Sequence, residues 1–241
     1  MKYNNSDKQR KKNLVLLFKV LDYFNISDLT ANHASVMSKD DKSFYINQHK
    51  NLFSEISNKN LVKIEIRNPN KVRLNKVNKA GYYIHKHLHR SKFKPMYVLH
   101  THSENAVAIS CLKNGLNTKL NQSSMRFFNA VETFKYNGMV IDDKEGKKLS
   151  NLLKKSTRLI ILENHGIIII APTIEELFHL TFHFEKCASI QLKVENSKHE
   201  MIKVKDSVAI ETFKSHNSFG PVGKMSWKAI LRVLNLTDIE K

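Results

Sequence analysis

Three histidines are spaced along the sequence as the ligands of a metal ion would be: His100, His102 and His165. His100 and His102 flank Thr101 at the end of an apolar run, and residues i and i+2 of a strand point to the same face. His165 lies in a short connection between two further apolar runs, where loops often carry function. Three imidazoles from two strand ends leave a position open for water or substrate, as catalytic zinc requires. The alternative is a set of hydrogen-bonded histidines without a metal.

Two other histidine pairs are spaced one helical turn apart and are weaker candidates for a metal site. They are His85 with His89, and His179 with His183, the latter close to Glu185. Pairs at i and i+4 can chelate zinc from one helix face. Neither pair belongs to an HExxH motif, so we expect structural roles for both.

The composition is that of an ordinary globular chain, with 241 residues of which 41% are hydrophobic and 26% charged. The only cysteines, Cys111 and Cys187, are too few for a disulfide framework, which favours a cytoplasmic location. No apolar run approaches the roughly 20 residues that span a bilayer, and the N-terminal segment lacks the features of a signal peptide. We therefore expect no membrane partner.

The net charge of +18 permits a weaker hypothesis, binding to nucleic acid. Only seven of the 40 cationic residues are Arg, which makes better phosphate and base contacts than Lys. The lysines are also spread along the chain, so we do not expect a nucleic-acid partner. Glycine-rich phosphate loops and the GxSxG motif are absent from the sequence, so nucleotide binding and serine-hydrolase chemistry have no support.

The hydrophobic periodicity predicts alternating helices and strands in one α/β domain. We expect helices over residues 13–24, 81–91, 104–112, 143–155, 173–194, 208–213 and 227–234. We expect strands over residues 34–37, 43–46, 61–66, 96–100, 136–141, 158–162 and 166–171, with a hairpin turn at residues 40–42. Thr173 and Glu176 predict a capping box at the start of the longest helix.

Several motifs, in order along the chain, resemble those of the class II aldolase/adducin domain family. Residues 98–103, Val-Leu-His-Thr-His-Ser, resemble the family's VVHTHS core, and residues 161–166, Ile-Leu-Glu-Asn-His-Gly, resemble LRNHG. Residues 29–36 resemble the early GH-S-R loop, residues 84–89 the IH…IH helix, and residues 172–191 the long helix ending in E-AC--Q. The resemblance covers residues 13–195, and the chain is identified as a member of this family.

Membership implies a single three-layer α/β/α domain with a central, largely antiparallel sheet. It implies that His100, His102 and His165 hold a divalent metal ion, zinc being the expected one, and that Asn32 and His33 of the early loop bind substrate. The family's aldolases are lyases that break or form a C–C bond in a small hydroxy-carbonyl compound. The metal acts as a Lewis acid and a carboxylate moves protons. These enzymes are homotetramers with active sites at subunit interfaces.

The sequence departs from the family pattern where the catalytic acid is expected. Sugar-phosphate aldolases carry Ser-Ser-Glu shortly before the metal-binding strand, where residues 79–81 here are Lys-Ala-Gly. Other members carry a Gln-Glu pair after that strand, and residues 121–125 here lack a carboxylate. Met37 stands in place of the loop arginine. Glu104 and Glu132 are the candidate replacement acids, with a solvated or helix-capping role as the alternative for each.

Residues 78–85 keep the pattern N-AG--IH, which resembles the adducin-like branch of the family. Two hypotheses follow: a metal-dependent, class II aldolase-like lyase, or a non-catalytic oligomeric interaction module like the adducin head. We divide the chain into a basic N-terminal tail at residues 1–12, the aldolase/adducin-like domain at residues 13–195, and a C-terminal helical extension of the same domain at residues 196–241.

Overall fold

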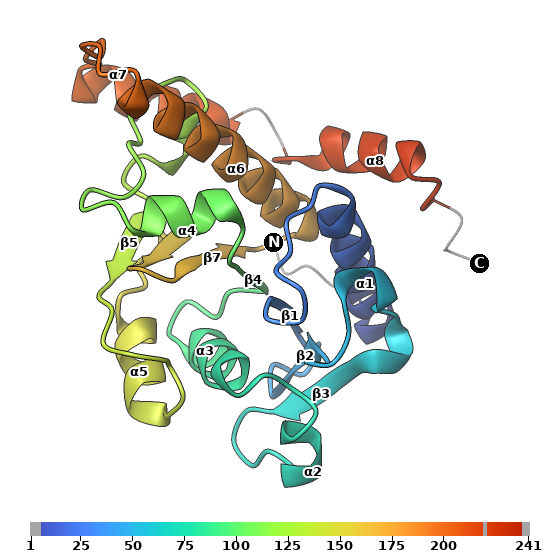
Figure 1. Cartoon of the computed structure of the whole chain (residues 1–241). Helices are drawn as coiled ribbons and strands as arrows, with labels where there is room; N and C mark the ends of the chain where they lie inside the picture. Colours follow the sequence, from blue (N-terminus) through green and yellow to red (C-terminus); the bar gives the residue numbers. More distant parts are fainter. Residues whose placement is uncertain (1–5, 219–220, 238–241) are drawn as a thin grey trace.

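The computed structural model describes residues 6–218 and 221–237 and is built on one mixed sheet (Figure 1). The seven strands of these residues lie in the order β3-β2-β1-β4-β7-β6-β5. Every neighbouring pair is antiparallel except β5 and β6, which are parallel. The strands are β1 (His33–Met37), β2 (Ser43–Asn47), β3 (Leu61–Glu65), β4 (Tyr97–Thr101), β5 (Val131–Phe134), β6 (Leu159–Leu162) and β7 (Gly166–Ala171).

Helices cover both faces of this sheet and complete the predicted three-layer α/β/α domain. They are α1 (Asp7–Tyr23), α2 (Lys71–Leu74), α3 (Lys79–Arg90), α4 (Glu104–Ser110), α5 (Asp143–Asn151), α6 (Ile174–Asn196), α7 (Asp206–Ser218) and α8 (Lys224–Val233). Helices α1, α4 and α6 pack on one face, whereas α3 and α5 pack on the other (Figure 1). The fold class predicted from the sequence is therefore confirmed.

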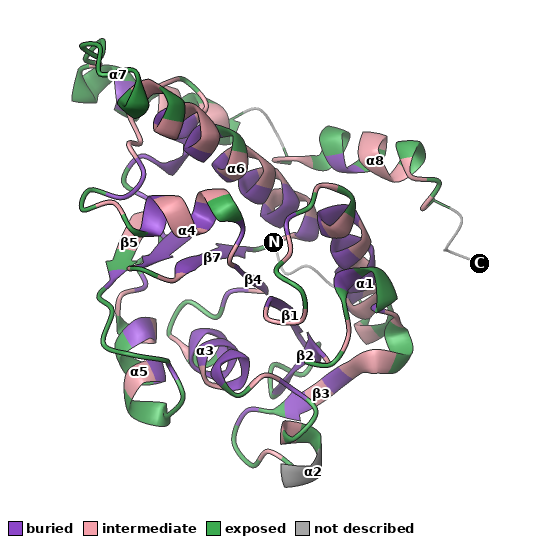
Figure 2. Cartoon of the chain, in the orientation of Figure 1, coloured by how far each residue is buried: buried purple, intermediate pink, exposed green. Residues whose placement is uncertain are grey.

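The two-residue period of the strands assigns each side chain to one of these faces. In β4, Tyr97 and Leu99 join the core under α1 and α6, whereas Val98 joins the core under α3 and α5. His100 follows Val98 by two residues and therefore lies on the α3 side. All six residues of β7 are buried because helices cover both faces of the sheet at its centre (Figure 2).

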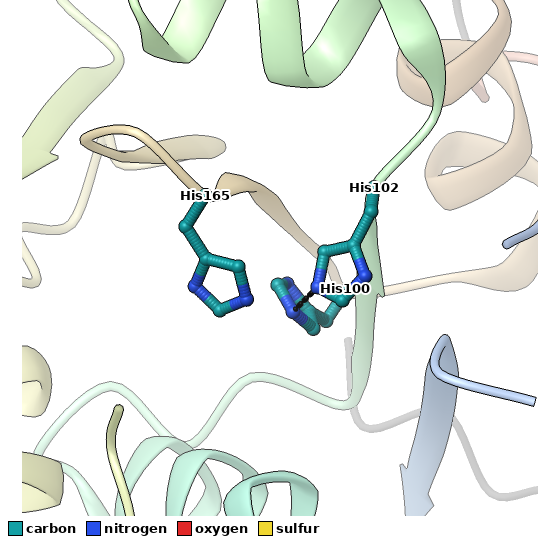
Figure 3. A group of neighbouring side chains, drawn as sticks. All are labelled: His100, His102 and His165. Carbon is teal, nitrogen blue, oxygen red and sulfur yellow. Dashed lines mark hydrogen bonds between the residues drawn. The ribbon is translucent and has the colours of Figure 1, made fainter. Parts of the chain in front are cut away.

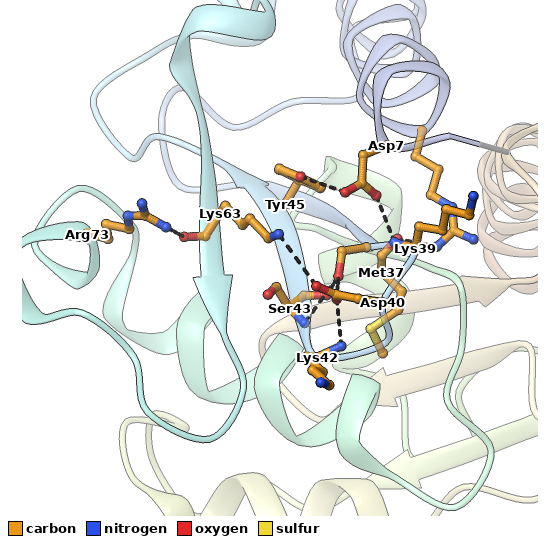
Figure 4. A network of polar contacts seen from close by, with 11 residues as sticks. Asp7, Met37, Lys39, Asp40, Lys42, Ser43, Tyr45, Lys63 and Arg73 are labelled. Atoms are coloured by element: carbon orange, nitrogen blue, oxygen red, sulfur yellow. Dashed lines mark hydrogen bonds and ion pairs between the residues drawn. The ribbon is translucent and has the colours of Figure 1, made fainter.

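The first helix begins earlier than predicted, at Asp7 in place of residue 13. Ser6 caps the helix, since its Oγ accepts a hydrogen bond from the backbone N–H of Gln9. The Asp7 carboxylate also accepts hydrogen bonds from the backbone N–H of Lys39 at 2.7 Å and the hydroxyl of Tyr45 at 3.0 Å (Figure 4). Residues 7–12, predicted as a basic tail, are thus part of the domain. The first five residues of that tail lie outside the described residues.

The strand predicted at residues 136–141 is wrong, and β5 at Val131–Phe134 takes its place in the sheet. The β5 strand pairs in parallel with β6, from Val131 opposite Leu159 to Phe134 opposite Leu162. In the following loop Tyr136 and Met139 are exposed, and Gly138 has a φ of 97°. The apolar residues there lack a neighbouring strand with which to pair.

The longest helix, α6, keeps one half of its predicted capping box. The Oγ1 of Thr173 accepts a hydrogen bond from the backbone N–H of Glu176 at 3.1 Å. The Glu176 carboxylate pairs instead with the guanidinium of Arg158, at 3.4 Å. Beyond α6, Trp227 of α8 is buried against Phe178, with ring centroids 5.5 Å apart.

Cys111 is exposed and Cys187 is buried, and both thiols are free. Within the described residues, none of the helices combines the length and the apolar character that crossing a membrane requires.

Candidate metal centre

Three histidines from two parts of the sheet converge on the α3 side. His100 is in β4, His102 follows the end of β4, and His165 lies in the turn between β6 and β7. One ring nitrogen of each lies within 4.8 Å of the others, and the Nε2 atoms of His100 and His102 are 2.6 Å apart (Figure 3). Among the described residues this is the one group of at least three potential metal ligands. The sequence therefore predicted which histidines meet.

A tight turn carries His165 to the end of β4. Asn164 has a φ of 52° and Gly166 a φ of 154°, and glycine adopts such positive values most readily. The backbone N–H groups of Asn164 and His165 donate to the carbonyl oxygen and Oγ of Ser110, at 3.0 and 3.1 Å. A Cβ atom on Gly166 would lie 2.6 Å from the carbonyl oxygen of Thr101. The glycine thus allows the turn to approach β4.

Hydrogen bonds fix which nitrogen of each ring faces the centre. The Nδ1 of His100 lies 2.9 Å from the carbonyl oxygen of Ile167, which can only accept, so this Nδ1 carries a proton. The Nδ1 of His102 lies 3.2 Å from the Asp28 carboxylate and donates in the same way. In the neutral rings both Nε2 atoms therefore carry lone pairs, and two lone pairs cannot hydrogen-bond to each other. A divalent cation satisfies both, so the donor set fits a metal ion.

Asp28 and Asn32 orient His102, a role that the sequence does not predict for either residue. The Asp28 carboxylate holds the His102 ring, as carboxylates do in many zinc sites. The amide of Asn32 accepts a hydrogen bond from the backbone N–H of His102 at 3.3 Å and donates one to the Thr101 hydroxyl at 3.1 Å. Asn32 is buried, so both ends of its amide position the metal-site strand. No sequence motif marked Asp28.

Burial keeps the three imidazoles in their neutral, ligating form. Desolvation lowers the pKa of His100 well below its ordinary value, and neighbouring histidines lower it further. Desolvation also lowers the pKa of His165, to about 4. For His102 desolvation lowers the pKa more than the Asp28 carboxylate raises it. Neutral imidazole is the form that binds metals.

A cavity of about 690 Å³ opens beside His102, and neither His100 nor His165 is among the residues that line it. Asp28, Glu104 and Glu185 line it. The Glu185 carboxylate accepts hydrogen bonds from the Ser103 hydroxyl at 2.5 Å and the Asn105 amide at 3.0 Å, while burial raises its pKa. Glu104 lies in the first turn of α4 and is exposed.

Glu132, the second candidate acid, lies on β5 at the edge of the sheet, and β6 and β7 separate it from β4. Its carboxylate forms an ion pair with Lys154 at 3.0 Å. The structure does not bring it together with the three histidines.

In the other two histidine pairs, His85, His89 and His179 make hydrogen bonds with protein groups, whereas the Nδ1 of His183 is buried without a partner among the described residues. His179 accepts from the Arg126 guanidinium at 2.7 Å, and desolvation together with this cation lowers the pKa of His179 to about 4 and of His183 to about 3. A neighbouring cation opposes metal binding. His85 and His89 both contact the hydroxyl of Ser35 on β1, at 2.5 and 2.6 Å.

Comparison with known proteins agrees with this geometry. The sequence profile described as Class II Aldolase and Adducin N-terminal domain matches residues 12–192. An aldolase II superfamily protein from Pseudomonas syringae has a similar crystal structure, with a TM-score of 0.85 and 25% identity over 98% of this chain and 96% of that chain. The L-fuculose 1-phosphate aldolase from Glaciozyma antarctica PI12 has a similar fold, with a TM-score of 0.78 and 21% identity over 94% and 90% of the two chains. Gamma-adducin of Homo sapiens is 26% identical over 196 residues, which are 79% of this chain and 27% of that protein.

Proposed function

The chain belongs to the class II aldolase and adducin N-terminal domain family, and from this premise we propose that it is a metal-dependent, aldolase-like lyase. His100, His102 and His165 would hold a divalent ion, with zinc as the expected one. The substrate would be a small hydroxy-carbonyl compound in which a C–C bond is cleaved or formed.

One observation carries this proposal: the Nε2 atoms of His100 and His102 face each other at 2.6 Å while both Nδ1–H groups are engaged elsewhere. This arrangement leaves two lone pairs for a cation, and His165 supplies a third donor. When bound, the ion would supply a Lewis acid for negative charge developing on a substrate oxygen. Three protein ligands leave room for that oxygen.

The chain's own residues favour a substrate without a phosphate group. Residues 79–81 lack the two hydroxyl side chains that sugar-phosphate aldolases carry at this place. The cavity beside His102 would hold the substrate, with Glu104 and Lys186 on its wall. Glu185 is already hydrogen-bonded to Ser103 and Asn105, so we assign it to shaping this cavity.

Elemental analysis of the purified protein tests the metal site. We expect about one zinc ion per chain in the wild type and its loss in His102→Ala, since three ligands are needed for a stable site. His179→Ala is the matched control, because His179 is a half-buried histidine outside the cluster. Wild-type protein without metal, or His102→Ala with about one zinc ion per chain, would contradict the assignment of these histidines as metal ligands.

Turnover separates the lyase from the second candidate, a non-catalytic interaction module. The likeness to gamma-adducin and the missing carboxylate at position 81 favour that alternative. Retro-aldol cleavage of hydroxy-carbonyl compounds that disappears in His102→Ala would eliminate it. Native mass on the same samples tests the homotetramer that the family likeness suggests.

A further inference from the structure

A large cavity opens at the end of the sheet opposite the metal centre. It has a volume of about 890 Å³, and the loop before β4, the loop between α5 and β6, the end of β7, and helices α6 and α7 line it. Ala171, the last residue of β7, is part of its wall, whereas His165 precedes the first residue of that strand. The ends of β7 are five residues apart, which is about 17 Å in an extended chain. The cavity is therefore separate from the metal centre, and its size is typical of a small-molecule site.

Part of the cavity wall is apolar and aromatic. Ile170 and Ala171 contribute to it from β7, and the rings of Phe93 and Phe213 contribute from the loop before β4 and from α7. Phe93 is 40% exposed, although Phe is among the residue types that are most often buried. These side chains offer a contact surface for a flat, apolar group.

The charges on the same wall leave two cations without a partner. The guanidinium of Arg158 pairs with the Glu176 carboxylate at 3.4 Å, and the ammonium of Lys154 pairs with a carboxylate on β5 at 3.0 Å. Lys94 and Lys155 also line the cavity, and neither ammonium group forms an ion pair or a hydrogen bond within residues 6–218 and 221–237. The wall therefore has an excess of two positive charges.

The loop between α5 and β6 adds hydrogen-bond donors to these charges. Thr157 closes a turn in this loop, because its Oγ1 accepts a hydrogen bond from the backbone N–H of Lys154 at 2.8 Å. The Thr157 hydroxyl keeps its own proton to donate. The backbone N–H groups of Lys155 and Ser156, within this turn, form no hydrogen bond to another described residue. Unpaired N–H groups of a turn are common in anion-binding sites.

We propose that this cavity is a second ligand site and that it binds a small phosphomonoester with an aromatic group. A phosphomonoester carries about 1.5 to 2 negative charges at neutral pH, which matches the excess charge of the wall. Its terminal oxygens accept hydrogen bonds, and Lys94 and the turn at residues 154–157 supply the donors. The aromatic group lies against Phe93 and Phe213. This site goes beyond the proposed lyase function, since the two sites lie at opposite ends of the sheet.

Calorimetric titration of the full chain with 1-naphthyl phosphate, at pH 8 and physiological salt, tests the site. We expect one binding site per chain. Inorganic phosphate and 1-naphthol should each bind at least about tenfold more weakly, because each lacks one half of the ligand. Absence of binding of 1-naphthyl phosphate, or equal binding of inorganic phosphate, would overturn the proposal.

The variant His102→Ala distinguishes this cavity from the metal centre, where a metal ion could itself bind phosphate. We expect His102→Ala and the wild type to bind 1-naphthyl phosphate with equal affinity. A loss of binding in His102→Ala would place the phosphate at the metal centre and refute the second site. The titrations do not depend on turnover, so their outcome is independent of the lyase function.

Substitutions in the wall test which residues bind the probe. Lys155→Gln should raise the Kd for 1-naphthyl phosphate by about tenfold, as expected for the loss of one charge-assisted contact. Lys50→Gln is the matched control, because it removes the same charge from an exposed turn residue outside this cavity. Equal affinities in these two variants would show that the probe responds only to the net charge of the chain, and the site would be refuted.

Phe93→Leu tests the aromatic half of the site. This variant keeps an apolar side chain but removes the ring, so the Kd for 1-naphthyl phosphate should rise by about 3- to 10-fold. Binding of inorganic phosphate should not change. An unchanged Kd for 1-naphthyl phosphate would refute the aromatic contact.

A peptide that contains phosphotyrosine tests the source of the ligand, because it presents an aryl phosphate on a protein chain. We expect it to bind at least about tenfold more weakly than 1-naphthyl phosphate, since the cavity has the volume of a small-molecule site. Tighter binding of the peptide would overturn the assignment of a small ligand.

Discussion

Replacing Asp28 by Asn should weaken metal binding without changing the three ligands. The Asp28 carboxylate accepts the Nδ1–H of His102 at 3.2 Å, and it thereby increases the electron density on the Nε2 that faces the centre. An amide keeps the shape and an acceptor oxygen but removes the negative charge. We therefore expect a loss of affinity and not a loss of the fold.

The size of this loss follows from the exposure of the pair. A carboxylate that hydrogen-bonds to a metal-binding histidine typically raises metal affinity by about 10- to 100-fold. The Asp28 side chain is 49% exposed and its contact with Nδ1 of His102 is long, at 3.2 Å. Water therefore screens its charge, and we expect the lower end of this range of affinity. We expect about a tenfold higher Kd for zinc, which is about 1.4 kcal/mol.

Competition with a chromogenic chelator at pH 8 measures this Kd. At that pH the histidines are neutral, so the change in the proton affinity of His102 does not enter. Asp41→Asn removes the same charge from an exposed turn residue with a φ of 54°, a conformation that Asn tolerates. Equal affinities for wild type, Asp28→Asn and Asp41→Asn would show that Asp28 does not support the metal ligand.

Three further predictions concern stability. Gly166→Ala places its Cβ 2.6 Å from a backbone carbonyl oxygen, whereas Gly138→Ala, also at positive φ, meets nothing within 4 Å. Urea denaturation should show that Gly166→Ala is less stable than Gly138→Ala by at least about 1 kcal/mol. An equal loss of stability in the two variants would contradict the close approach. Burial lowers the pKa of His89 to about 4, below its ordinary 6.5, so the unfolded chain binds more protons between these values. The free energy of unfolding of the metal-free protein should fall as the pH drops from 6.5 to 4, and His89 should contribute up to about 3 kcal/mol of this fall. If stability depends on pH equally steeply in His89→Gln, His89 is not the cause. Trp227→Ala should cost about 3 kcal/mol by opening a cavity under α8, and a stability unchanged in thermal melts followed by circular dichroism would mean that α8 does not support the core.

Strong periodicity made much of the fold predictable. The β1 and β2 strands with their turn, the buried β7, and α6 with its Thr173 cap all lie where the sequence placed them. Each depends on local patterns, such as an apolar run bounded by turn residues. The strand β5 was missed because only its pairing with β6 distinguishes Val131–Phe134 from the apolar loop that follows.

The three histidines were predictable because two short-range rules apply to them. An HxH pair in a strand must share a face, and a turn between two buried strands must lie at the end of the sheet. That this turn approaches the end of β4 depends on the antiparallel pairing of β4 with β7, in which His100 lies opposite Ile168. The family motifs carried that information, whereas the spacing of residues 100 and 165 did not.

By itself, the sequence determined the alternation of elements, the histidines that can bind a metal and the absence of the usual glutamate. Only the tertiary structure decided what surrounds them. Asp28 reaches His102 from a loop 74 residues earlier in the chain, and His33 reaches His85 over 52 residues. Such contacts depend on strand order and helix docking, which bring distant residues into register. Hydrogen-bond direction, and with it the tautomer of each histidine, exists only once those partners meet.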